Sequence, residues 1–174
     1  MSRSKLEETS AKNVVKSVMN EANMRIQKTA QPVIGNIVEL LQELKQKGVF
    51  LAMSTADNLS NTISHLLLLG IFDYFDVVLC EDGKVIRGAQ PIKGSAPAEN
   101  LGVITEALGV PLEKTIVVGD TRTDIRLGVV GGAGLTLGVM SGIGKLEDLM
   151  PTDGKSPKAN DVLKDISEIR KYFQ

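Results

Sequence analysis

Short apolar runs alternate with segments of helical periodicity along most of the chain. The runs lie at residues 49–53, 76–80, 115–119, 135–139 and, more weakly, 160–162. Helical patterns separate them at 59–69, 97–108, 123–130 and 145–149. Strands that are apolar on both faces and are separated by helices indicate a doubly wound parallel α/β sheet. Ligands bind such sheets at the carboxyl ends of the strands, so the residues after each run are the candidates for chemistry.

Helical patterns also occur at both ends of the chain. Apolar residues recurring every four positions predict an amphipathic helix at 11–28. A second apolar face at 34–44 predicts a helix that Gly48 ends, and a last helix is expected at 162–169. We therefore divide the chain into an N-terminal helical segment, residues 1–31, and an α/β core, residues 32–174.

Composition narrows the classes of protein further. With 174 residues, 43% hydrophobic and 24% charged, the chain suits one globular domain. A net charge of −1 and only 3% aromatic residues argue against binding to nucleic acid or to a membrane surface. The single cysteine, Cys80, fits a reducing compartment, and the apolar runs are too short to span a bilayer. The expected location is the cytoplasm.

Polar side chains at the end of the first strand suit phosphate binding. The hydroxyl of Ser54 or Thr55, beside free backbone N–H groups, can donate to a phosphate oxygen. The alternative is that the segment only begins the next helix, with Asp57 or Asn58 as its N-cap, and the residues do not decide between the two. Further along, Lys93 lies in a proline-bounded loop and can bring a cation to a phosphate. Taken alone, Lys93 is more simply interpreted as a solvated surface lysine.

The strand at 115–119 leads into the most informative segment. It ends in Gly119, Asp120 follows directly, and Asp124 comes at the start of a helix. Mg²⁺ prefers carboxylate oxygens and keeps several waters, so one or two aspartates at a strand end are suitable ligands. The alternative is that Asp120 caps a turn and Asp124 interacts with the helix dipole. The strand–loop–helix setting favours a Mg²⁺ site.

Three features thus occur in a fixed order: a strand ending in Ser/Thr, a looped lysine, and a strand followed by Gly-Asp-x-x-x-Asp. In this order they resemble motifs two, three and four of the haloacid-dehalogenase superfamily. The sequences linking them are similar to its phosphoglycolate-phosphatase-like branch, at residues 32–48, 69–76, 108–114, 132–134 and 138–142. The resemblance implies a Mg²⁺-dependent phosphatase whose partner is a small phosphorylated metabolite.

The resemblance also implies a role for each candidate residue. Thr55 would bind the phosphate, with Ser54 as the one-residue alternative. Lys93 would act as a catalytic residue that contacts the phosphate and the nucleophile. Asp120 would hold Mg²⁺, and Asp124 would support the catalytic site or complete the metal shell.

The first motif of that superfamily, Asp-x-Asp-Gly-Thr, is absent from the sequence. Its first aspartate is the nucleophile of the family, so the resemblance implies an impaired or incomplete phosphatase. The alternatives are a non-catalytic domain that binds phosphate, metal or a protein, and an unrelated doubly wound binding domain.

The resemblance further implies that residues 1–31 are the remnant of a helical cap and that the sheet, of order 5-4-1-2-3, lacks its central strand. Strand 49–53 then pairs with strand 115–119, another chain fills the gap, or the chain folds poorly; self-association through the gap or the N-terminal helix is a further expectation.

Overall fold

The computed structural model describes residues 36–82, 85–87, 90–92 and 101–174. The helix predicted at 11–28, the predicted boundary at residue 31 and Lys93 lie outside these residues. The chain divides into two compact units, one that includes Leu41–Ala98 and one that includes Val33–Leu40 with Glu99–Gln174. Helix α2 (Ile37–Gln46) contains residues assigned to both units.

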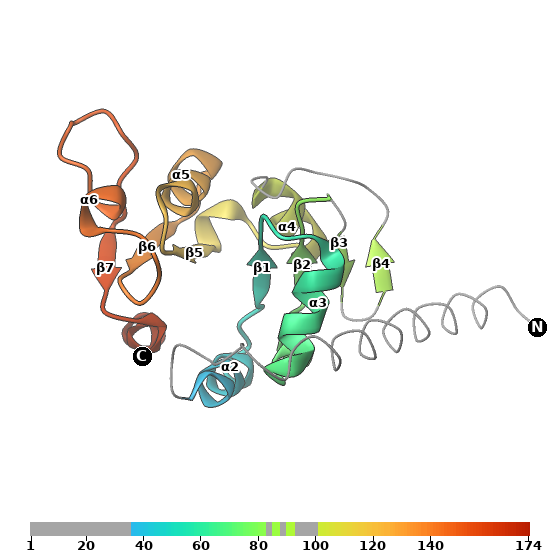
Figure 1. Cartoon of the computed structure of the whole chain (residues 1–174). Helices are drawn as coiled ribbons and strands as arrows, with labels where there is room; N and C mark the ends of the chain where they lie inside the picture. The colour runs from blue at the N-terminus through green and yellow to red at the C-terminus, as the bar shows by residue number, and fades with distance from the viewer. Residues whose placement is uncertain (1–35, 83–84, 88–89, 93–100) are drawn as a thin grey trace, which may run out of the picture. The chain divides into compact units, whose positions relative to one another are not determined.

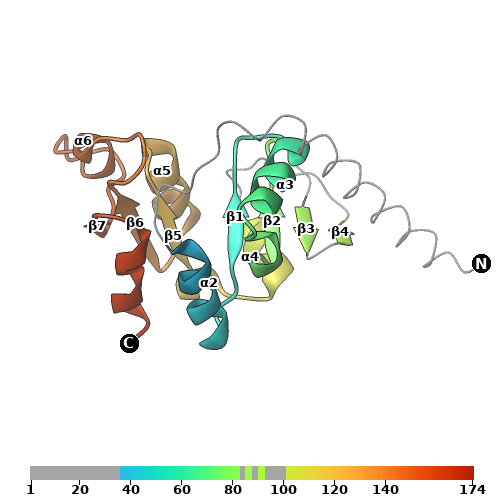
Figure 2. The same ribbon diagram turned by 60° about the horizontal axis from the view of Figure 1, so that its bottom comes forward.

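The first unit contains a four-stranded sheet of order β1-β2-β3-β4 (Figure 1). Its elements are β1 (Ala52–Ser54), α3 (Leu59–Leu68), the 3-10 helix η1 (Phe72–Tyr74), β2 (Val77–Leu79), β3 (Val85–Arg87) and β4 (Gln90–Ile92). Strands β1 and β2 are parallel, whereas β2, β3 and β4 pair antiparallel. In both views α3 runs alongside β1 and β2 (Figures 1 and 2). Strand β2 is fully buried, as are Ile63 and Leu66 of α3.

Local sequence explains where α3 begins and ends. Asn58 is its N-cap and accepts a hydrogen bond from the backbone N of Asn61 at 3.0 Å. After the helix, Gly70 takes φ +66°, a left-handed conformation that glycine adopts without steric cost. The expectation that Asp57 or Asn58 would cap this helix is confirmed for Asn58.

The second unit contains a three-stranded parallel sheet of order β5-β6-β7. Its elements are α4 (Leu101–Leu108), η2 (Leu112–Lys114), β5 (Ile116–Gly119), α5 (Arg122–Gly131), β6 (Leu135–Val139), α6 (Leu146–Leu149), β7 (Asp161–Leu163) and η3 (Ile166–Tyr172). Helices α5 and α6 lie on one side of this sheet and η3 lies on the other (Figure 2). Ile125, Leu149 and Ala159 form a buried cluster against which Met150 and Val162 pack.

The α/β class with parallel strands is confirmed. The described strands form two sheets, a division that the expected lack of a central strand allows. Two details differ from the sequence-based expectation. The antiparallel pair β3–β4 was not predicted, because each strand has only three residues and one of them, Pro91, is a poor strand former that edge strands tolerate. The last helix begins at Ile166, since Val162 and Leu163 belong to β7.

Strands β1 and β5 each stand at the end of their sheet. Among the described ladders β1 pairs with β2 and β5 with β6. A pairing of strands 49–53 and 115–119, one of the three alternatives, is not among them. All residues of β5 are half-buried although they are apolar, whereas β6 is buried from Thr136 onward. The backbone N of Leu135 donates to the Thr115 carbonyl, a register that turns the backbone groups of Ile116 and Val118 away from β6. Filling of this edge by another chain and self-association stay predictions.

Every helix in the described part of the chain is too short or too polar to cross a membrane.

Candidate functional site

Asp120 directly follows β5, at the carboxyl end of the parallel sheet of the second unit. Its carboxylate is half-buried, and its Oδ2 accepts a hydrogen bond from the backbone N of Ile143 at 2.7 Å. Ile143 belongs to the turn after β6, the neighbouring strand. The pairing of β5 with β6 therefore brings the two strand ends together and holds Asp120 between them.

Asp124 lies in the first turn of α5 and folds back over the strand end. Its Oδ2 accepts from the backbone N of Asp120 at 3.1 Å, the backbone N of Thr121 at 2.9 Å and the Thr121 hydroxyl at 2.8 Å. The Thr121 side chain accepts from the Asp124 N in return, which completes a capping box. The alternative interpretation expected Asp124 to interact with the helix dipole, and its place in the first turn of α5 agrees with that. Its hydrogen bonds also satisfy backbone N–H groups that the helix itself leaves unpaired.

The chemistry of these two carboxylates fits Mg²⁺ in part. Within the described residues, all the hydrogen bonds that the Asp120 and Asp124 carboxylates accept fall on Oδ2. Oδ1 of each carboxylate is therefore available there to a cation. The same part of the chain holds no group of three or more His, Cys, Asp or Glu side chains placed to hold a metal. Mg²⁺ commonly takes one or two carboxylates and completes its shell with water and substrate phosphate. Asp120 and Asp124 are therefore sufficient as protein ligands only if a phosphate or water supplies the rest.

The hydroxyl candidates lie in the first unit, at the end of β1. Ser54 is the last residue of the strand, and Thr55 donates its backbone N to the Leu79 carbonyl at 2.9 Å. The Thr55 Oγ1 accepts from the backbone N of Asp57 at 3.1 Å. Because this bond uses a lone pair of the oxygen, the hydroxyl hydrogen of the half-buried Thr55 remains able to donate to a phosphate.

The predicted site residues thus fall in both units of the chain. Asp120 and Asp124 come together in the second unit, and Ser54 and Thr55 are adjacent in the first. Lys93 lies outside the described residues. A phosphate pocket shared by Thr55, Lys93 and Asp120 stays a prediction.

The turn at 142–144 is a part of the site that sequence reasoning missed. It follows β6, and its backbone contacts Asp120 through the Ile143 N–H. The available signal was the pair of glycines, Gly142 and Gly144, placed directly after a strand end. A backbone N–H donor carries no side-chain signature, so the sequence alone does not identify it.

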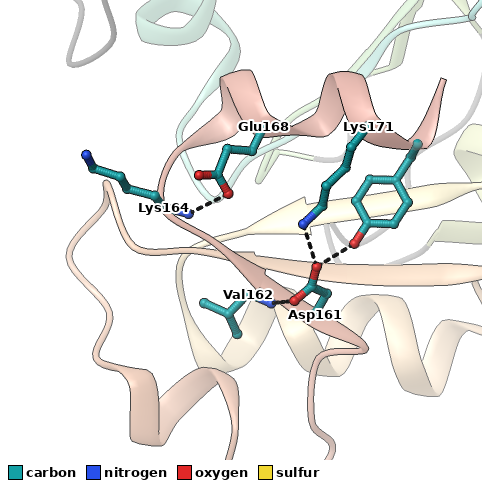
Figure 3. Close-up of polar contacts among 6 residues, drawn as sticks. Asp161, Val162, Lys164, Glu168 and Lys171 are labelled. Carbon is teal, nitrogen blue, oxygen red and sulfur yellow. Dashed lines mark hydrogen bonds and ion pairs between the residues drawn. The ribbon is translucent and has the colours of Figure 1, made fainter. Parts of the chain in front are cut away.

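A second polar cluster, near the C-terminus, has a structural explanation. Figure 3 shows Asp161, at the start of β7, facing Lys171 of η3. The Asp161 carboxylate accepts from Lys171 Nζ at 2.8 Å, from the Tyr172 hydroxyl at 2.6 Å and from the backbone N of Val162 at 2.8 Å. These bonds lower the pKa of Asp161 to about 2, the Lys171 contact contributing most. The cluster ties η3 to β7 and leaves little capacity for a ligand.

Comparison with protein families gives matches over most of the chain. The haloacid dehalogenase-like hydrolases match residues 3–132, and the HAD-hydrolase-like family matches residues 97–169. The phosphoglycolate phosphatase of Neisseria meningitidis is 32% identical over 114 residues, which cover 66% of this chain and 45% of the relative. That of Pectobacterium atrosepticum is 28% identical over 138 residues, covering 71% of this chain and 56% of the relative. The chain therefore spans about half the length of these two relatives.

Solved structures show the same fold. A predicted phosphatase from Clostridium acetobutylicum superposes with a TM-score of 0.61 at 23% identity, covering 79% of this chain and 57% of that one. A haloacid dehalogenase-like family hydrolase from Streptococcus pneumoniae gives a TM-score of 0.62 at 20% identity, covering 81% of this chain and 60% of that one. At these identities the likeness supports the fold, and the α/β core with parallel strands agrees with it.

Proposed function

Because this chain belongs to the haloacid dehalogenase-like hydrolase family, we propose that it carries the cation- and phosphate-binding part of a phosphatase site for small phosphomonoesters. The observation that carries the proposal is Asp120, held at the carboxyl end of β5 by the Ile143 N–H on Oδ2, while Oδ1 accepts no hydrogen bond from the described residues. The proposed cation is Mg²⁺, and the proposed location is the cytoplasm. Phosphoglycolate is the substrate that the names of two relatives suggest.

Each residue has a defined task in this proposal. Mg²⁺, when bound, would supply positive charge that neutralises the phosphate oxygens. Asp120 would hold the cation. Asp124 would restrain the backbone at Asp120 and Thr121 through the hydrogen bonds that its Oδ2 accepts, and would offer Oδ1 as a second ligand. Thr55, or Ser54, would donate its hydroxyl hydrogen to a phosphate oxygen, and Lys93 would stabilise the charge that develops during transfer.

Turnover by the chain alone is expected to be very low. The sequence contains no Asp-x-Asp motif, so no residue matches the family's nucleophile. Loss of a covalent nucleophile lowers the rate of a hydrolase by about 10⁶-fold in a well-studied protease. We therefore propose that efficient catalysis requires a nucleophile from a further polypeptide segment. The second candidate function, phosphate or protein binding without turnover, is favoured by the same absence.

A binding and activity assay tests the proposal. Mg²⁺ with inorganic phosphate should raise the melting temperature of the 174-residue chain, and Asp120→Ala should abolish the increase. Hydrolysis of p-nitrophenyl phosphate should be close to the buffer rate in both proteins. Turnover that disappears in Asp120→Ala would instead show a complete enzyme. No response to phosphate or Mg²⁺ would contradict the proposed site.

A further inference from the structure

The turn formed by Gly142, Ile143 and Gly144 lies unusually close to Asp120. A Cβ on Gly142 would come within 2.0 Å of Asp120 Oδ2 and 2.3 Å of its Cβ and Cγ. A Cβ on Gly144 would come within 1.7 Å of the Asp120 carbonyl oxygen. Only glycine fits at both positions, because these separations are far below ordinary van der Waals contact.

The contact is made by the backbone of the turn. Ile143 donates its N–H to Asp120 Oδ2 at 2.7 Å, whereas its side chain is 89% exposed. Burial of the Ile143 side chain therefore does not hold the turn in place. A hydrogen bond to a carboxylate is stronger than one between neutral groups, so it restrains the Asp120 side chain.

We propose that the turn at 142–144 is a positioning element that orients Asp120 as a cation ligand, an inference that rests on the proposed function. The Ile143 N–H engages Oδ2, and Gly142 packs against the same oxygen. This arrangement limits rotation of the carboxylate and would leave Oδ1 to hold the cation. Hydrogen bonds behind a ligating group commonly raise metal affinity about 10–100-fold, which sets the expected size of the effect.

The test compares two glycine substitutions in the full chain. Gly142→Ala places a methyl group against the Asp120 carboxylate and should weaken Mg²⁺ binding 10–100-fold. Gly154→Ala is the matched control, since Gly154 has φ +67° but nothing within 4 Å of its Cβ. It should lower stability and leave Mg²⁺ affinity unchanged. Titration of ¹⁵N-labelled protein with Mg²⁺ alone, followed through the amide shifts, measures the affinity without reference to activity.

A second variant covers the case in which Gly142→Ala does not fold. Asp120→Glu keeps the charge but moves the carboxylate by one methylene, away from the 2.7 Å contact with the Ile143 N–H. It should weaken Mg²⁺ binding at least tenfold and speed hydrogen exchange at the Ile143 amide. Wild-type affinity in Gly142→Ala or in Asp120→Glu would overturn the positioning role alone. Absence of Mg²⁺ binding in the wild-type chain would overturn the proposed function and this inference together.

Discussion

Gly119 and Asp124 are packed so closely that a Cβ on Gly119 would lie 2.0 Å from the Cβ of Asp124 and 2.4 Å from its Cγ. The absent side chain is what allows Asp124 to fold back and accept the backbone N–H groups of Asp120 and Thr121. The glycine and the second aspartate of the Gly-Asp-x-x-x-Asp segment are therefore one structural unit.

Gly119→Ala is expected to destabilise the protein by about 1–3 kcal/mol, the usual cost of forcing extra atoms into a packed site. The added methyl group must displace Asp124 and with it the capping box of α5. Chemical denaturation measures the change. Gly131→Ala is the control, because the nearest atoms to its Cβ would be those of the Leu101 side chain, at 3.2 Å or more, and a shift of a few tenths of an ångström accommodates the methyl group. Equal stability of Gly119→Ala and the wild type would contradict the close packing.

Asp124→Ala should cost about 0.5–2 kcal/mol, the range for loss of capping at a helix N-terminus, because it removes the N3 partner of the N-cap Thr121. It removes the acceptor of three hydrogen bonds at the start of α5. Asp120→Ala leaves the Asp124 acceptor in place and should cost less. Comparison of the two variants therefore separates a capping role of Asp124 from a role as a metal ligand alone. A larger loss in Asp120→Ala than in Asp124→Ala would argue against the capping role. Thermal unfolding followed by circular dichroism gives the order.

Asp76 in the first unit should matter more for stability than its partner Lys45. Asp76 accepts from Lys45 Nζ at 2.7 Å and 2.8 Å and from the backbone N of Leu51 at 2.8 Å. Asp76→Ala leaves both donors without this acceptor and should cost about 1–3 kcal/mol. Lys45→Met preserves the Leu51 contact and should cost less. The two single variants of a double-mutant cycle give the order of these two costs. A larger loss of stability in Lys45→Met than in Asp76→Ala would contradict the prediction.

Asp161 should contribute to acid sensitivity. Its pKa falls from 3.8 to about 2, chiefly through the hydrogen bonds from Lys171 and Tyr172. Because the folded-state pKa lies below the unfolded one, the contribution is present above about pH 4 and is lost as the pH falls towards about 2. Asp161→Asn should lower the melting temperature by only a few degrees at pH 7, since the ion pair of Asp161 with Lys171 is exposed. In acid, the melting temperature of this variant should fall less steeply than that of the wild type.

The comparison for this prediction is Asp153→Asn. The pKa of Asp153 is also lowered to about 2, mainly by hydrogen bonds from Ser156, so both carboxyls titrate in the same range. Each variant should therefore remove only the part of the acid-induced decline in melting temperature that its own carboxyl group causes. If the melting temperature of Asp161→Asn declines between pH 4 and pH 2 as steeply as that of the wild type, the contacts of Asp161 do not stabilise the fold.

Several features of this protein follow from local sequence. The apolar runs at 76–80, 115–119 and 135–139 became β2, β5 and β6, because short apolar runs between turn signals and helices are typical of strands in an α/β sheet. The helices end at Gly48, Gly70, Gly109 and Gly132, each with positive φ, since only nearby residues decide that conformation. The placement of Asp120 after a strand and of Asp124 in a first helical turn was predicted for the same reason.

Tertiary structure decided which strands share a sheet and what Asp120 contacts. Apolar periodicity reports which faces are buried and does not name the neighbour across a ladder, so the β3–β4 hairpin was not foreseen. The Ile143 N–H reaches Asp120 from 23 residues away only because β5 and β6 pair in parallel. Every residue except proline carries such a donor, and only the fold selects the one that binds the carboxylate.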